Sequence, residues 1–348
     1  MTNHPTIHSI QYLRAIAVIM VVFHHELIQI ETYAKALGDI NFGAAGVDIF
    51  FVISGFVIWF VTHDRKVGVW EFLKKRFVRV VPMYWLVTLT IVVMTAIAPQ
   101  FFRSTSFDAI QVIQSLLFIP YYSNSHPGLI WPILVPGWTL NYEIFFYMLF
   151  GLFLVFPRNI HWKILFLFLN LVLLGLVFDV NSALFQTYTN PLLLEFVAGV
   201  FIGKAYTDGR IKGFSGKFGF LLIIMGFLIL SVLDNLKLYV GLSAVLIVLG
   251  SLIVETARNL PRLRLLHLLG DASYSIYLTH ILALGIYREI WYQLAFVEIS
   301  FLQIILFIIG GLIFTMACGV IFHLVIERPL LKYLSNKFTK KRGCLEQR

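Results

Sequence analysis

Charged side chains are scarce in this sequence. Of its 348 residues, 13% are Asp, Glu, Lys or Arg, whereas 59% are hydrophobic. A soluble globular domain carries about twice that share of charged residues, because its surface faces water. The composition therefore excludes an ordinary soluble globule and indicates that a lipid bilayer surrounds most of the chain.

Cysteine is also rare. Cys318 and Cys344 are the two in the chain, and they form no spacing pattern. We expect both to be reduced thiols, and we expect neither a disulfide nor a metal site. The chain shows no internal repeat, low-complexity stretch or soluble domain. Residues 1–348 are interpreted as a single integral-membrane domain, with a basic cytoplasmic tail at 333–348.

Long hydrophobic runs are what the sequence has instead. A run of about 17 to 25 apolar residues is long enough to cross a bilayer as a helix. Ten such runs occur, near 10–28, 45–62, 79–98, 139–157, 162–179, 190–206, 217–233, 238–254, 271–291 and 301–325. They predict an all-α polytopic membrane protein with about ten transmembrane helices. Gly43, Gly46 and Gly55 are predicted to be positions where helices pack closely.

A net charge of +9 would suit a nucleic-acid partner, but the positions of the basic residues favour another explanation. Numbering the ten helices in order brings most Lys and Arg to one side of the membrane. Lys35, Arg103, Lys237 and Arg288 fall on the other side, and Arg14 lies within the membrane. By the positive-inside rule, both termini are then cytoplasmic. The basic residues are expected to meet anionic lipid headgroups, and no nucleic-acid partner is predicted.

The longest loop runs from Pro99 to Gly137 and contains a short, mostly apolar piece, Ala109 to Ile119, with several prolines. It falls on the outer side in this topology. We expect a folded or re-entrant cap over the outer face.

Two ionisable residues, Arg14 and His25, interrupt the first apolar run. Each residue of an α-helix turns roughly 100° about the axis, so eleven residues return to within about 20° of the starting direction. Arg14 and His25 therefore face the same side of the helix, about 16 Å apart along its axis. Ionisable groups at membrane depth are costly and usually face a protein cavity. The alternatives are that Arg14 extends to the inner headgroups and that His25 only packs between helices.

The predicted topology sorts the other buried ionisable groups into two levels. A histidine and two carboxylates share the outer level: His25, Asp48 and Glu143. Arg14 shares the inner level with Arg76 and Arg79, whose i, i+3 spacing lets both guanidinium groups converge on one anion. The sequence thus predicts a cationic entrance inside and a His-carboxylate cluster toward the outside.

These residues also carry a family resemblance. The stretches are LRAIAVIMVVFHH (13–25), GVDIFFVISGFVIW (46–59), KRFVRVVPMYWL (75–86), GWTLNYEIFFY (137–147), SYSIYLTH (273–280) and IERP (326–329). In that order they resemble the integral-membrane acyltransferase type 3 family. That family acylates, most often acetylates, cell-surface and exported glycans.

The resemblance implies that His25 is the catalytic base, since neutral imidazole suits removal of a hydroxyl proton. Glu143 or Asp48 would orient that ring or bind the acceptor, with Glu143 favoured by the WTLNYE stretch. The implied donor is an acyl-CoA, with acetyl-CoA expected. Its phosphates would suit Arg76 and Arg79, with Arg14 deeper along the path.

Four further residues are open to two interpretations each. Position 24 is a second histidine, which departs from the family pattern, so His24 competes with His25 for the catalytic role. Trp138 belongs to an interfacial aromatic belt or contacts sugar. His280 binds substrate in the cavity wall or is a buried hydrogen-bonding residue. Ser54 is the one hydroxyl that would serve a covalent relay instead of direct transfer.

The sequence therefore favours an O-acyltransferase of a bacterial inner membrane. It would move an acyl group, with acetyl or succinyl open, from cytoplasmic acyl-CoA to a glycan or lipid-linked saccharide hydroxyl. One alternative is a secondary transporter, which commonly shows two related halves that are not seen here. The other is a non-catalytic polysaccharide export or flippase subunit, in which His25→Ala would change nothing.

Overall fold

The computed structural model describes residues 6–29, 42–64, 67–99, 106–232, 237–258, 260–294 and 301–345, and every regular element in them is helical. Each of the ten predicted apolar runs lies on a helix. These helices are α1 (His8–Gln29), α3 (Gly46–Thr62), α4 (Val69–Ile97), α6 (Trp138–Phe153), α7 (Ile160–Val177), α9 (Leu193–Thr207), α10 (Gly216–Val232), α11 (Lys237–Ala257), α12 (Arg264–Leu294) and α13 (Phe301–Phe322). The prediction of an all-helical fold is confirmed.

Six stretches are long and apolar enough to cross a membrane by length and composition. They are His8–Ile28, Gly43–Thr62, Val69–Ile97, Ile160–Val177, Tyr239–Ala257 and Phe301–Lys337. Of the other four predicted spans, α6, α9 and α10 have 16, 15 and 17 residues. Helix α12 is longer but carries the polar stretch 273–280. The chain is a polytopic membrane protein, while ten spans with cytoplasmic termini stay a prediction.

The last span continues beyond its predicted end at residue 325. One π-helical turn, η5 (His323–Glu327), joins α13 directly to α14 (Arg328–Leu345). The predicted tail at 333–348 therefore begins inside a helix, and residues 346–348 lie outside the described part. Cys318 is a free thiol, as expected, whereas the side chain of Cys344 is not among those described.

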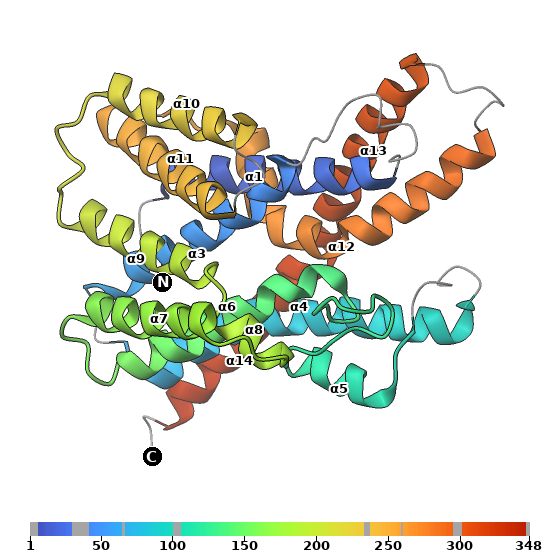
Figure 1. The fold of residues 1–348 in the computed structure, drawn as a ribbon, viewed down its shortest axis with the longest axis horizontal. Helices are drawn as coiled ribbons and strands as arrows, with labels where there is room; N and C mark the ends of the chain where they lie inside the picture. The colour runs from blue at the N-terminus through green and yellow to red at the C-terminus, as the bar shows by residue number, and fades with distance from the viewer. Residues whose placement is uncertain are drawn as a thin grey trace.

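Helix α1 occupies a central position. It packs against α3, α11, α12 and α13. Figure 1 shows α1 with α10 to α13 in the upper half of the molecule and α4 to α8 in the lower half. Helix α1 begins on the left of this view and ends on the right. We call these two ends of the bundle the inner end and the outer end.

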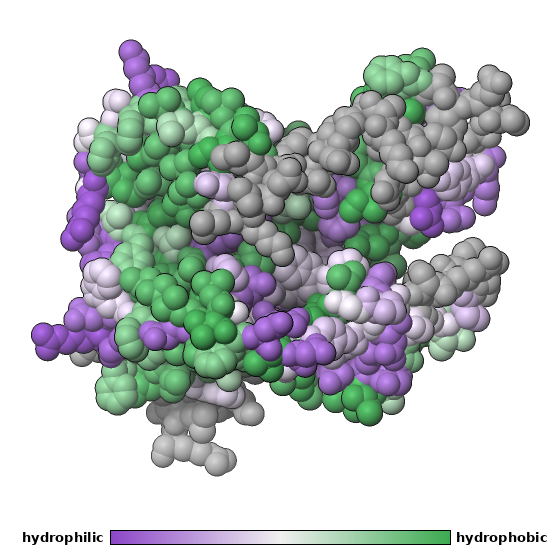
Figure 2. Space-filling view, in the orientation of Figure 1, coloured by the Kyte–Doolittle hydropathy of each residue, from purple (hydrophilic) through white to green (hydrophobic). Residues whose placement is uncertain are grey.

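The outside of the bundle is apolar over much of its area. Large side chains such as Phe166, Leu176 and Ile313 are exposed on the outer faces of α7 and α13. Figure 2 shows hydrophobic residues over α7, α10 and α11 and hydrophilic ones along the left edge, the inner end, and again toward the lower right. This distribution fits a bilayer, since exposed apolar surface is stable against lipid and costly in water.

Glycines allow the backbones of α1, α3 and α9 to meet. A Cβ atom on Gly46 would overlap the carbonyl oxygen of Ala17 in α1, and one on Gly55 would overlap that of Phe196 in α9. A Cβ on Gly43 would lie 2.6 Å from the Met20 carbonyl oxygen. The three glycines therefore are close-packing positions, as predicted. They fix the depth of α3 against its neighbours.

The long outer loop is folded. Helix α5 (Ala109–Leu116) begins at Asp108, whose carboxylate accepts a hydrogen bond from the Gln111 amide, 2.8 Å away. The hydroxyl groups of Ser115 and Tyr121 lie 2.7 Å apart, and burial raises the pKa of Tyr121. Ser115 also accepts a hydrogen bond from the Ile133 amide. These bonds hold residues 117–134 as an ordered loop at the outer end.

Candidate functional site

The described residues form two neighbouring cavities in the bundle that share part of their lining. The outer cavity has a volume of about 1600 Å³, and the inner cavity about 230 Å³. The outer cavity is lined by four of the predicted site residues: His25, Asp48, Trp138 and His280. The inner cavity is lined by the other four: Arg14, Arg76, Arg79 and Glu143. The structure therefore divides the predicted site into two groups.

His25 faces the outer cavity from the last turns of α1. Its Nδ1 lies 2.9 Å from the carbonyl oxygen of Val21, one turn earlier in the same helix. A carbonyl oxygen can only accept, so Nδ1 carries the proton and Nε2 is the basic nitrogen. A backbone carbonyl thus fixes the tautomer, and no carboxylate is needed for that purpose.

His280 of α12 lies against His25, with ring centroids 4.8 Å apart. Its Nδ1 donates to the carbonyl oxygen of Tyr277 at 2.6 Å, and its buried Nε2 has no hydrogen-bond partner in the described part of the chain. His24 also lines the cavity, edge-on to His25 at 5.3 Å. The hydrogen bonds of the two Nδ1 atoms thus leave Nε2 as the acceptor nitrogen of both rings, His25 and His280.

Asp48 lines the outer cavity but has a partner of its own. It is buried in the first turn of α3 and hydrogen-bonded to Glu195, a buried carboxyl of α9. Two carboxyl groups share such a bond only when one of them keeps a proton. Asp48 therefore belongs to a carboxyl pair that joins α3 to α9 beside the cavity.

Glu143 does not lie beside His25, and this corrects the predicted outer cluster. Its Oε1 accepts hydrogen bonds from Ser54, at 3.2 Å, and from Tyr147, one turn further along α6. Glu143 is also the anionic neighbour of Arg14 and Arg76. The helix itself was predicted to begin at residue 139, within one residue of the observed start at Trp138, so the error lies in how α6 packs against α3 and α4, which brings Glu143 to the inner cavity.

The three arginines meet at the inner cavity as predicted. Arg14 donates from Nη2 to the Ser273 hydroxyl of α12 at 2.9 Å. Arg76 lies over the Phe72 ring, and its buried Nε has no hydrogen-bond partner among the described residues. An unpaired guanidinium N–H is a ready donor for an anion. Arg79 is exposed, which leaves the cationic group open to entering ligands.

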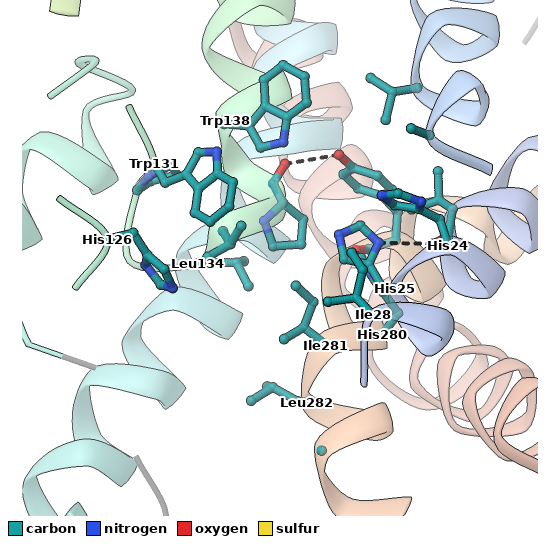
Figure 3. Close-up of a pocket in the computed structure, with 18 of the residues that line it drawn as sticks. His24, His25, Ile28, His126, Trp131, Leu134, Trp138, His280, Ile281 and Leu282 are labelled. Atoms are coloured by element: carbon teal, nitrogen blue, oxygen red, sulfur yellow. Dashed lines mark hydrogen bonds between the residues drawn. The ribbon is translucent and has the colours of Figure 1, made fainter. Parts of the chain in front are cut away.

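Aromatic residues form the wall that faces the histidines. Figure 3 shows Trp131 and His126 of the outer loop across the cavity from His24, His25 and His280, with Trp138 above them. Trp131 meets His126 at 5.0 Å between ring centroids, and Trp138 meets Tyr142 at 5.9 Å. Flat rings beside polar groups suit a ligand that has both apolar faces and hydroxyls.

Several site residues escaped the sequence argument. Glu195 and Tyr147 carried a usable signal, because one is a lone carboxyl in an apolar run and the other lies four residues after Glu143. Trp131 fits an interfacial aromatic belt by its sequence position, and only the folded loop brings it to the cavity. Tyr277, which lines both cavities, stood unremarked in the hydroxyl-rich stretch SYSIYLTH.

The site therefore has a neutral base, His25, at the outer cavity. Behind it lies the inner cavity, where Arg76 offers an unpaired N–H donor among the described residues. Such a pair can hold an anionic ligand on one side and accept a proton from a hydroxyl on the other.

Comparison with known proteins bears directly on this site. A family profile described as an acyltransferase domain matches residues 7–324. The chain is similar to the exopolysaccharide production protein ExoZ of Rhizobium meliloti (strain 1021), with 39% identity over 296 residues, covering 83% of this chain and 90% of the relative. No solved structure matches it. The profile spans both cavities and every predicted site residue, so the chain belongs to the acyltransferase type 3 family.

Proposed function

We propose that this protein is an O-acyltransferase of a bacterial inner membrane. It takes an acyl group, acetyl in the first instance, from cytoplasmic acyl-CoA and places it on a hydroxyl of an exopolysaccharide or its lipid-linked precursor. Family membership supports acyl transfer, and the similarity to a protein of exopolysaccharide production supports the acceptor class. The observation that carries the proposal is His25 at the outer cavity, in the tautomer that makes Nε2 its basic nitrogen.

The inner cavity receives the donor. The phosphates of coenzyme A suit the exposed Arg79 and the unpaired Nε of Arg76, because guanidinium groups bind phosphate through paired N–H donors. The pantetheine arm then points toward His25, about 16 Å beyond Arg14 along α1. While no anion is bound, the carboxylate of Glu143 balances the positive charge of the arginines. When phosphate takes its place beside them, Glu143 keeps its hydrogen bonds from Ser54 and Tyr147.

The outer cavity receives the acceptor. Its aromatic wall stacks against sugar rings, with Trp138 and Trp131 as the candidates, and His280 accepts a hydrogen bond from an acceptor hydroxyl at its free Nε2. Asp48 lies at the same cavity and contributes a hydrogen-bonding oxygen held in place by Glu195. Ligand sites commonly combine an apolar lining with a few such fixed polar groups.

The chemical step is a direct transfer. His25 Nε2 takes the proton of the acceptor hydroxyl as its oxygen bonds to the thioester carbonyl carbon. The carbon–sulfur bond then breaks, and the leaving thiolate takes the proton from His25, which restores the neutral base. No net proton is consumed, and no covalent acyl-enzyme is required.

Mass spectrometry of surface glycans tests this function. Cells that lack the gene should lose a mass increment of one acyl group, wild type should restore it, and His25→Ala should not. Restoration by His25→Ala would remove the catalytic assignment and favour a subunit of glycan export. The size of the increment distinguishes acetyl from succinyl.

A further inference from the structure

The two cavities are separated by very little protein. Among the described residues, Val47 of α3 and Tyr277 of α12 line both of them. The aromatic ring of Tyr277 lies between Phe50, which lines the inner cavity, and His280, which lines the outer cavity. On the inner side it meets Phe50 at 6.0 Å between centroids, and on the outer side it meets His280 at 5.7 Å.

The Tyr277 ring is held in this position by its hydroxyl. The oxygen lies 3.0 Å from Oγ1 of Thr139 and donates to the carbonyl oxygen of Pro136 at 3.2 Å. Pro136 lies in η4 (Val135–Gly137) and Thr139 in the first turn of α6, two elements that follow one another in the chain and lie far from α12 in the sequence. The side chain therefore links α12 to η4 and α6, and its hydroxyl is held by these two hydrogen bonds.

We propose that Tyr277 is a removable partition between the donor cavity and the acceptor cavity. Hydrogen bonds to Thr139 and Pro136 keep it closed at rest, and the acyl-pantetheine arm displaces the ring to bring its thioester to His25. This assignment rests on the proposed function in one respect, namely that the donor enters from the inner end.

A partition has a clear physical purpose here. The outer cavity is large enough to hold many water molecules, and water that met the thioester beside His25 would attack it in place of the sugar hydroxyl. The water oxygen would bond to the carbonyl carbon of the thioester and the carbon–sulfur bond would break. The leaving thiolate would then take a proton from the attacking water. Active sites that close against water suppress such side reactions.

Cysteine labelling tests the closed state without reference to catalysis. In a background with Cys318→Ser and Cys344→Ser, Val57→Cys or Gln11→Cys places a thiol in the inner cavity and Ile281→Cys places one in the outer cavity. A charged, membrane-impermeant methanethiosulfonate is then added from the outer side. Addition from the inner side shows that the Val57→Cys and Gln11→Cys thiols react.

With Tyr277 in place, outer reagent should modify Ile281→Cys and leave the two inner thiols unmodified. Adding Tyr277→Ala should speed labelling of the inner thiols at least about tenfold, and Thr139→Val, which removes the hydroxyl tether only, should give an intermediate rate. Labelling of the inner thiols from outside with Tyr277 intact would overturn the proposal. So would their protection in the Tyr277→Ala protein while Ile281→Cys still reacts.

Hydrolysis of acyl-CoA without acceptor gives a second readout. The Tyr277→Ala protein should release coenzyme A several times faster than wild type, whereas Tyr277→Phe, which keeps the ring but loses both hydrogen bonds of the hydroxyl, should release it at an intermediate rate, as Thr139→Val should. Equal release by Tyr277→Ala and wild type would contradict a barrier to water. If no variant turns over acyl-CoA, the proposed function fails, and the labelling result still decides whether Tyr277 separates the cavities.

Discussion

The imidazole rings of His25 and His280 meet with their centroids 4.8 Å apart, and each ring donates its Nδ1 proton to a backbone carbonyl of its own helix. Their Nε2 atoms are left as two acceptors at one cavity. One nitrogen can act as the base while the other orients the hydroxyl that loses its proton.

His280→Asn should raise the KM for the acceptor about fivefold with a smaller change in kcat. Asn keeps an amide donor near the position of Nδ1, which preserves the bond to Tyr277, but it removes Nε2. The loss of one hydrogen bond to substrate costs about 1 kcal/mol. Steady-state kinetics against acceptor concentration measures the effect, with His280→Gln as the variant that keeps a polar atom near Nε2. A normal KM in His280→Asn would show that the ring serves packing only.

Arg76→Ala should raise the KM for acyl-CoA by roughly 10- to 100-fold, because a hydrogen bond to a charged group contributes about 1.5 to 3 kcal/mol. The same substitution should scarcely affect acetyl-pantetheine, which has no nucleotide phosphates. Lys75→Ala is the matched control, since the adjacent Lys75 is exposed and paired with Glu71 at 2.8 Å. Lower turnover at unchanged donor affinity would argue against phosphate binding at Arg76.

Trp131→Ala should weaken acceptor binding by about tenfold, since a large aromatic surface at the outer cavity is lost. Trp131→Phe should retain much of the affinity because a flat ring remains. Binding of a glycan fragment to the detergent-solubilised protein measures this directly. Trp70→Ala, at an exposed position outside both cavities, should bind like wild type. Equal losses in the two Ala variants would point to a general defect in folding.

Gly55→Ala should destabilise the bundle by about 1 to 3 kcal/mol or more, because the added methyl group overlaps the α9 backbone at Phe196. Gly285→Ala is the control within a helix, since a Cβ there meets open space and Ala is the better helix former. Thermal unfolding in detergent should show a lower midpoint for the first variant and an unchanged or higher one for the second. Similar midpoints would mean that α3 and α9 can separate without cost.

The helices were predictable because each apolar run is long enough to be seen without its neighbours. The grouping of Arg14, Arg76 and Arg79 at one cavity was also predictable, since helix periodicity and topology place all three at the inner end. Glu143 was misplaced although the start of α6 was predicted to within one residue. Its position depends on how α6 packs against α3 and α4, which the periodicity of a single helix does not reveal.

The partners of the site residues were beyond sequence reasoning for a related reason. Glu195 lies about 150 residues from Asp48 in the chain, and only the close packing of α3 on α9 brings them together. The orientation of His25 was assigned to a carboxylate by analogy with hydrolases, whereas the helix itself supplies the acceptor at Val21. The local backbone geometry of α1 fixes the orientation of the His25 ring, and a search for charged partners does not reveal this bond.

Transfer of an isotope-labelled acetyl group by the purified protein in proteoliposomes tests the central claim most directly. Labelled acetyl-CoA is supplied on the inner side and a glycan acceptor on the outer side. Wild type and His24→Ala should yield an alkali-labile ester on the glycan, and His25→Asn should lower the rate by about 10²- to 10⁴-fold, the usual contribution of a general base. Equal labelling by wild type and His25→Asn would contradict the account.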